Sequence, residues 1–216
     1  MTHLELLQKL DACADAVEWS KGFETLEAAW NGCRRSDWML SLLREIGFDN
    51  PRILRLYACA CVRRTPIGDG RTVWDLLTDE RSKNAVLVAE NFANGLATEE
   101  ELAAARTAAV AARSARAAAR AAGDVGAAAR AARAAAELTR DAAWIAAGDE
   151  EAADREAWDA SCAARDAAGA AAGAAQCNIL REMLPFSIVQ KHVDKLCAKW
   201  AEEAVEAVSS PGKANV

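Results

Sequence analysis

The sequence predicts an all-α protein, on the strength of three observations. Alanine accounts for 38 of the 73 residues from 103 to 175, a stretch without proline, and alanine has the highest helix propensity of all residues. Capping residues, glycines and prolines divide the rest of the chain into segments in which apolar residues recur with helical spacing. No segment shows the alternation of apolar and polar residues that is typical of a half-buried strand.

Four helices are expected before residue 65. The first follows a capping-box pattern, Thr2 with Glu5, and its apolar residues continue with helical spacing to Val17. The fourth opens with Asn50 as N-cap and Pro51 at the first helical position, where the missing N–H of proline has no helical partner to lose. The second, third and fourth helices are expected over residues 25–33, 37–46 and 51–64.

The segment from 66 to 95 is expected to hold a loop and two further helices. Glycines at both ends make 68–70 a flexible loop, and a short helix is expected over 72–77. Thr78 is the expected N-cap of a longer helix that runs to Asn94, with Gly95 as its C-terminal glycine.

The Ala-rich part is expected to form long helices. Thr98 opens a capping-box pattern before the first of them. Glycine-containing turns at 123–126 and 148–149 divide the tract into three helices, and the third is expected to bend or end at Gly169 and Gly173. Alanine buries little area per residue, so large side chains must supply much of the packing energy.

The C-terminal part is expected to end in an amphipathic helix. A preceding helix ends at Pro185, and Ser187 is the expected cap of the last helix, which runs to about residue 208. We therefore expect a cluster of short N-terminal helices packed on a bundle of long Ala-rich helices. The expected domain covers residues 1–208, with a short-helix lobe at 1–95, an Ala-rich bundle at 96–208 and a flexible tail at 209–216.

Charge and hydropathy disfavour two classes of partner. The net charge of −6 and the pI of about 5.1 repel nucleic acid and anionic membranes at long range. The Ala-rich tract is long enough to span a bilayer, but it carries a charge every few residues, and one charge at mid-bilayer costs about 2.5–3.5 kcal/mol. The N-terminus lacks a basic segment followed by an apolar one. We expect a cytoplasmic protein with no membrane partner.

The cysteine count argues against a disulfide framework. Seven cysteines are scattered through the chain, whereas secreted disulfide scaffolds carry an even number in a short chain. We interpret them as reduced, buried, small apolar residues.

The seven tryptophans allow two interpretations. In the first, they fill the gaps between Ala-coated helices. In the second, some of them line a groove that binds a ligand or partner. Trp144 and Trp158 are candidates within the Ala-rich section, and the others serve the rest of the chain.

Four arginines form a ridge on one expected helix. At 100° per residue their side chains fall within an arc of about 80°, and no acidic residue lies between the first and the last. The ridge is either a solvated face that pairs with the acidic third Ala-rich helix, or an anion site, because guanidinium groups bind phosphate and carboxylate through two hydrogen bonds. The ridge consists of Arg106, Arg113, Arg116 and Arg120.

The residues that usually carry catalysis are scarce. Only two histidines are present, no Cys and His spacing fits zinc, and no Gly-rich phosphate loop occurs. A carboxylate cluster is conceivable, although acids in the first turn of a helix are expected from capping alone; its members would be Asp37, Asp75, Asp79 and Glu80. We therefore expect no catalytic residues, no metal, no cofactor and no enzymatic activity.

Two long stretches carry a family resemblance. They are DACADAVEWSKGFETLEAAWNGCRRSDWMLSLL and RLYACACVRR…VWDLLTDERSKNAVLVAENFANGLATEEELAAA, with a closing Gln-Cys-x-x-Leu-Arg pattern. Together they resemble an immunity-protein-like family of Ala-rich helical proteins from bacteria and phages, and the similarity covers most of residues 11–185. The immunity label of that family comes by analogy with toxin-neutralising proteins.

The resemblance implies a set of matching positions. Most have a structural role, such as packing by the tryptophans and capping by the aspartates. Arg55 and Arg81 are the two that we would test for function, because a buried arginine needs a partner. The matching positions are Trp30, Asp37, Trp38, Arg55, Cys59, Cys61, Arg64, Trp74, Asp79, Arg81 and Glu90.

Two functions from different classes follow. The first is an interaction protein that binds and neutralises a toxin or defence effector, of the immunity or anti-defence type. The alternative is a small-molecule or nucleotide sponge with a pocket built from Arg55, Trp74 and Arg81, and with the arginine ridge as the next candidate. Self-association into a homo-oligomer is left open, because an Ala-coated helix face would permit it.

Overall fold

The computed structural model describes residues 1–68, 70–77, 79–121 and 170–209, and this part of the chain is all-α apart from one two-stranded hairpin. The second and third Ala-rich helices expected from the sequence, with Trp144 and Trp158, lie outside the described residues. None of the described helices combines the length and the hydropathy that crossing a membrane requires.

The N-terminal part forms short helices, most of which begin where the capping residues predict. Thr25 and Asn50 each accept a hydrogen bond from a backbone N–H in the first turn of the helix that follows, and the capping box of Thr2 and Glu5 is present. The elements are α1 (His3–Lys9), α2 (Ala14–Ser20), α3 (Leu26–Gly32), α4 (Ser36–Glu45) and α5 (Pro51–Arg64).

The expectation of one helix from Thr2 to Val17 is wrong. The first helix ends at Lys9, and Leu10 closes it through hydrogen bonds from its N–H to carbonyls of the last turn. Asp11 then adopts a left-handed conformation with φ of 53°, which aspartate tolerates better than most residues. Because of this break α2 folds back beside α1, so the apolar residues of both helices face the same core.

The middle of the chain departs from the expectations in two details. The expected loop at 68–70, of which residue 69 lies outside the described residues, is flanked by the strands of a short antiparallel hairpin, β1 (Pro66–Gly68) and β2 (Arg71–Thr72). Asp79, and not Thr78, is the N-cap of the next helix. The remaining elements are η1 (Val73–Leu76), a 3₁₀ turn, α6 (Glu80–Ala93) and α7 (Glu99–Ala121).

Two helices complete the described chain, α10 (Ala170–Met183) and α11 (Phe186–Ser209). Gly173 lies inside α10 and does not end it. Ser187 is not the cap of the last helix as expected, because α11 already begins at Phe186.

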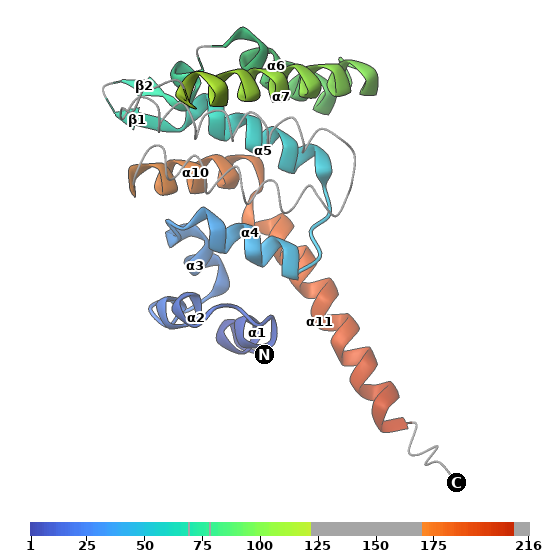
Figure 1. The fold of residues 1–216 in the computed structure, drawn as a ribbon. Coiled ribbons are helices and arrows are strands. Elements are labelled where there is room, and N and C mark those ends of the chain that lie inside the picture. The colour runs from blue at the N-terminus through green and yellow to red at the C-terminus, as the bar shows by residue number, and fades with distance from the viewer. Residues whose placement is uncertain (69, 78, 122–169, 210–216) are drawn as a thin grey trace.

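The helices stack in an order that differs from their order in the sequence (Figure 1). α7 packs on α6, α6 on α5, α5 on α10 and α10 on α4, with α1, α2 and α3 beyond α4. Thus α10, which the sequence places with the Ala-rich lobe, lies between two helices of the short-helix lobe. Residues of both expected lobes therefore share one core.

Helix α5 is buried on two sides and joins two apolar clusters. One side carries Tyr57 and Cys61 into a cluster formed with α1, α3, α4, α10 and α11. The other side carries Ala58 and Val62 into a cluster formed with η1, α6 and α7. All four residues are fully buried, so α5 is the central helix of the described fold.

One face of α10 binds the junction between α3 and α4. We call this face the α10 docking face. Its members recur with spacings of three and four residues, which places them on one side of a helix. They are Gly173, Gln176, Cys177, Leu180 and Arg181.

Polar side chains of the docking face bind the α3–α4 junction. The buried amide of Gln176 accepts a hydrogen bond from the Ser36 hydroxyl at 2.9 Å. The guanidinium of Arg181 donates to the carbonyl of Trp30 at 2.8 and 3.0 Å and to the carbonyl of Cys33. These carbonyls lie at the C-terminal end of α3, where a cation also complements the helix dipole. Arg181 therefore caps α3 from a distant part of the chain.

Gly173 allows the two backbones to approach closely. A Cβ atom at this position would lie 2.7 Å from the carbonyl oxygen of Arg34. Because that oxygen belongs to the backbone, it cannot move aside as a flexible side chain would. The close approach explains why a residue with low helix propensity lies inside α10.

We expect Gly173→Ala to lower the free energy of unfolding. Overpacking costs about 1–3 kcal/mol. Replacing glycine by alanine in a helix gains up to roughly 1 kcal/mol, so the cost is the larger of the two. Gly22→Ala is the matched control, because its Cβ would meet only the Trp19 carbonyl at an ordinary 3.5 Å. Urea unfolding followed by circular dichroism measures both. A Gly173→Ala protein as stable as the wild type would contradict the close approach.

Candidate functional site: a tryptophan-lined pocket

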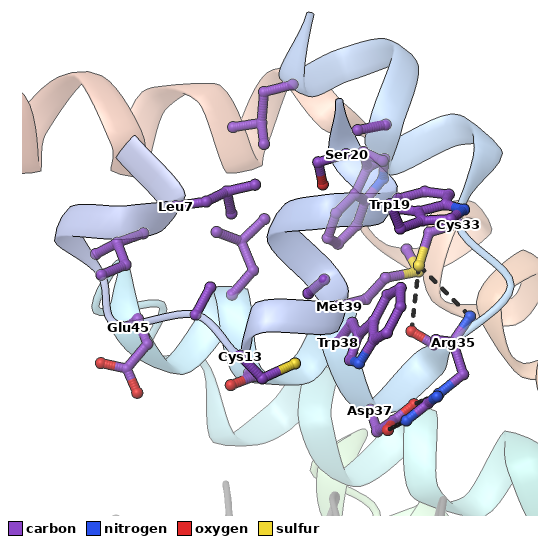
Figure 2. A pocket seen from close by; sticks show the side chains of 18 residues that line it. Leu7, Cys13, Trp19, Ser20, Cys33, Arg35, Asp37, Trp38, Met39 and Glu45 are labelled. Atoms are coloured by element: carbon purple, nitrogen blue, oxygen red, sulfur yellow. Dashed lines mark hydrogen bonds and ion pairs between the residues drawn. The ribbon is translucent and has the colours of Figure 1, made fainter. Parts of the chain in front are cut away.

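The helices α1 to α4 enclose a pocket of about 340 Å³ (Figure 2). We call it the Trp pocket, because three indoles line it, those of Trp19, Trp30 and Trp38. Leucine, alanine and methionine side chains from all four helices complete its wall, including Leu7 and Met39. The surface that it offers to a ligand is therefore mostly apolar.

Two of the indoles pack against each other at the wall. Trp19, near the end of α2, and Trp38, in the first turn of α4, have ring centroids 5.7 Å apart and planes tilted by 54°. Phe23 also packs on Trp19, at 4.6 Å between ring centroids. Tilted aromatic pairs of this kind are favourable, so the wall is held in place before any ligand arrives.

An ion pair forms the polar edge of the pocket. Arg35 donates from Nε and Nη2 to the two carboxylate oxygens of Asp37, at 2.8 and 2.5 Å. The side chain of Asp37 is only 5% exposed, whereas that of Arg35 is 49% exposed and its guanidinium lies 4.7 Å from the Trp38 ring centroid. The hydrogen bond to Asp37 raises the pKa of Arg35. The positive charge at this edge is thus matched by a carboxylate.

A thiol lies at the same side of the pocket. Figure 2 shows Cys33, Trp38 and Met39 next to the Arg35–Asp37 pair, with Leu7 on the other side. The Arg35 N–H donates to the Cys33 sulfur at 3.4 Å, and the Cys33 thiol donates to the Arg35 carbonyl at 3.3 Å.

Charges and hydrogen bonds favour the thiolate form of Cys33. A hydrogen bond from Cys177 is the largest cause of its lowered pKa; the backbone N–H of Arg35 and the charge of Arg181 act in the same direction, while burial and Asp37 oppose them. The same hydrogen bond and burial raise the pKa of Cys177.

A second, more open groove lies between α1 and α11. Its volume is about 900 Å³, and its wall mixes apolar and charged side chains. Lys9 stands over the ring of Trp200 there, with Nζ 3.9 Å from the centroid. On α11 its lining residues lie between Gln190 and Ala201.

The three residues of the expected Arg and Trp pocket make contacts with different partners. Arg55 is buried and stacks on Phe92, 4.8 Å from the ring centroid. Arg63, and not Arg55, is the arginine that the structure places over Trp74, also at 4.8 Å. Arg81 is exposed and pairs with the cap residue Asp79, at 2.8 and 3.1 Å. None of these residues lines the Trp pocket or the α1–α11 groove.

The arginine ridge is described only in part. Arg106 is half-buried on α7 and is engaged in an interaction. For Arg113, Arg116 and Arg120 the structure describes the helix backbone but not the side chains. The choice between a solvated face and an anion site stays open.

The carboxylates of the conceivable cluster bind different partners. Asp37 pairs with Arg35, as above, and Asp75 accepts from Thr72 in a capping box. Glu80 pairs with Lys83 on the exposed side of α6. Within the described ranges, no group of three or more His, Cys, Asp or Glu residues could hold a metal ion. The interpretation of these acids as capping and pairing groups fits their contacts.

The cysteines only partly follow the expectation. Those of the core, including Cys33, Cys59 and Cys61, are free and buried as predicted. Cys13 is exposed and lies at the wall of the Trp pocket, contrary to that prediction. The reason is the break between α1 and α2. Cys13 lies at this break and not inside the long first helix that the sequence predicted, whose apolar side would have buried it.

Sequence reasoning did not single out Arg35, Cys33 and Arg181 as site residues. A local signal existed for Arg35, because Arg-x-Asp-Trp before an expected helix places an arginine beside both a carboxylate and an indole. The role of Arg181 depends on α3 and α10 lying together, and only its place in the closing Gln-Cys-x-x-Leu-Arg pattern drew attention to it.

Comparisons of the chain with protein-family models, curated proteins and solved structures returned no match. The resemblance to immunity-protein-like proteins therefore stays a prediction. The fold and the pocket define an all-α protein with an apolar, aromatic-lined pocket between its N-terminal helices.

We expect a double-mutant cycle on Arg35→Ala and Asp37→Ala to give a coupling energy of about 0.5–3 kcal/mol, since removing the arginine leaves a buried carboxylate without this partner. The exposed pair of Lys21 and Glu18 is the control, because both side chains are more than half exposed; such pairs contribute little. Thermal unfolding of each set of variants measures the coupling. Equal coupling in the two pairs would contradict the role of burial.

Proposed function

We propose that the protein binds one small, uncharged, ring-containing molecule in the Trp pocket. The observation that carries this proposal is the pocket itself, with three indoles around about 340 Å³. Pockets for small molecules span about 300–1,000 Å³ and are mostly apolar with a few polar groups. The volume suits a ligand of about two fused rings.

The polar groups of the pocket favour an uncharged ligand over an anionic one. The guanidinium of Arg35 is already bound to Asp37 through two hydrogen bonds, so a phosphate would have to compete with a buried carboxylate. Glu45 at the wall adds a further negative charge. A nucleotide is therefore the weaker candidate for this pocket.

Trp30 supplies the one specific requirement for the ligand. Its side chain lines the pocket and is 97% buried, since only 3% of the residue is exposed. Its indole Nε1 is buried and has no hydrogen-bond partner among the described residues. An unsatisfied buried donor costs about 1–3 kcal/mol. We infer that a ligand with a hydrogen-bond acceptor, such as a ring carbonyl, binds best, once a small shift of the wall exposes this N–H to the pocket.

A set of three probes tests the proposed ligand class. Coumarin has two fused rings, no charge and a ring carbonyl; indole has similar size but no comparable acceptor; AMP carries a phosphate. Isothermal titration calorimetry of the full chain is expected to rank coumarin before indole, and indole before AMP. AMP as the tightest binder would favour the nucleotide alternative and overturn the proposal for this pocket.

We expect Ala29→Leu to weaken coumarin binding at least tenfold, because the longer side chain fills the pocket that Ala29 lines. Ala28→Leu is the matched control; it makes the same change one residue earlier on α3, at a position that does not line the pocket. Circular dichroism checks that both variants fold, and calorimetry measures binding. Equal binding by the two variants would place the ligand elsewhere.

We propose a protein partner as the second function, in line with the resemblance to toxin-neutralising proteins. The observation that favours it is α11, whose C-terminal part extends past the other helices (Figure 1). Residues 201–205 are exposed there, and Val205 is 65% exposed. An apolar side chain on a projecting helix is a common element of helix-in-groove recognition.

We expect Val205→Glu to abolish capture of a stoichiometric partner from a bacterial lysate, because a charge at the helix surface would have to be desolvated in the complex. Leu96→Glu is the control, since Leu96 is also an exposed apolar residue, at 74%, but precedes α7. Pull-down with quantitative mass spectrometry measures both. Capture that both variants retain, or that the wild type lacks, would count against this second function.

A further inference from the structure

Two thiols that are far apart in the sequence meet beside the Trp pocket. Cys33 follows α3, and Cys177 belongs to the α10 docking face. Both are buried in one apolar cluster, and the residues around them are in direct contact, since Ser36 donates to Gln176 and Arg181 binds the Cys33 carbonyl. The two thiols also interact with each other, and adjacent free thiols are the groups from which a disulfide forms.

The two thiols differ in access. Cys33 lines the Trp pocket, whereas Cys177 does not. Figure 2 shows the Cys33 sulfur at the pocket wall, with its hydrogen bonds to the Arg35 backbone. A small molecule that enters the pocket therefore reaches Cys33 and not Cys177.

The surroundings of Cys33 suit a reactive thiolate. The N–H of Arg35 donates to its sulfur at 3.4 Å, and the guanidinium of Arg181 is bound to its carbonyl. Asp37 is the acidic group nearby, and it is paired with Arg35. Thiolates are the nucleophilic form of cysteine, and a cation and a backbone N–H both favour them.

We propose that Cys33 and Cys177 form a peroxide-sensitive dithiol, in which Cys33 is oxidised first and Cys177 then closes a disulfide. This inference uses the pocket as a route of access and does not rest on the proposed ligand. The inference assigns a modification site to the contact between the α3–α4 junction and the α10 docking face.

The chemistry balances with hydrogen peroxide as the oxidant. The Cys33 thiolate attacks one peroxide oxygen, the O–O bond breaks, and hydroxide leaves, so that Cys33 becomes a sulfenic acid. The Cys177 sulfur then attacks the Cys33 sulfur, the S–O bond breaks, and hydroxide leaves with the Cys177 proton as water. In total, two thiols lose two electrons and one peroxide yields two waters.

The cysteines of α5 provide an internal comparison. Cys59 and Cys61 are as buried as Cys177 but line neither the Trp pocket nor the α1–α11 groove. Burial raises the pKa of both thiols, that of Cys61 to about 12. We expect them to stay reduced under conditions that oxidise Cys33.

Peptide mapping of the full wild-type chain tests the proposal. The protein is treated with hydrogen peroxide, its remaining thiols are alkylated in denaturant, and it is digested without reduction for mass spectrometry. The expected result is one cross-linked peptide pair that joins Cys33 to Cys177, reversed by dithiothreitol, with Cys59 and Cys61 alkylated. Thiols at 33 and 177 that remain free, or a link from Cys33 to the exposed Cys13, would overturn the proposal.

Three variants separate the two steps. In Cys177→Ser, oxidation is expected to stop at the sulfenic acid of Cys33, which dimedone captures at that residue. In Cys33→Ser, neither the dimedone adduct at this site nor the disulfide forms. Cys61→Ser, the control for loss of a buried thiol, keeps the 33–177 disulfide. Disulfide formation at Cys177 that persists in Cys33→Ser would show that the proposed order is wrong.

Discussion

The described fold depends on one contact, the seating of the α10 docking face against the junction of α3 and α4. Gly173 lets the backbones meet, Gln176 holds Ser36, and Arg181 closes the end of α3. Leu180, which is fully buried on the same face, supplies the apolar part of the contact. A polar group is costly to bury without a partner, so each of these hydrogen bonds makes the position of α10 specific as well as stable.

The same contact also shapes the pocket. Arg181 binds the carbonyls of Trp30 and Cys33, and both residues line the Trp pocket. Helix α10 therefore fixes one wall of a site to which it contributes no lining residue, and oxidation of Cys177 would act on the helix that holds this wall. The proposed ligand site and the proposed dithiol meet at the α3–α4 junction.

Local signals in the sequence predicted the helices well and the site poorly. Thr25, Asn50 and the Thr98 capping box start helices as expected, because a cap depends only on residues within one turn. The sequence did not predict the left-handed Asp11, because apolar residues continue with helical spacing across it. It did not predict the hairpin either, because two strands of two and three residues are too short to show an alternation of apolar and polar residues. For the tryptophans the sequence left packing and groove lining as alternatives, because nothing local indicates that Trp19 and Trp38 line one pocket.

By itself the sequence determined the all-α class, most helix starts and the scarcity of catalytic residue types, because propensity and capping act over a few residues. The tertiary structure alone decided that α10 lies between α4 and α5, that Arg181 caps α3, and that Cys33 meets Cys177. These contacts join residues more than a hundred positions apart. They follow from shape, burial and hydrogen-bond satisfaction across the whole core, which no single segment encodes.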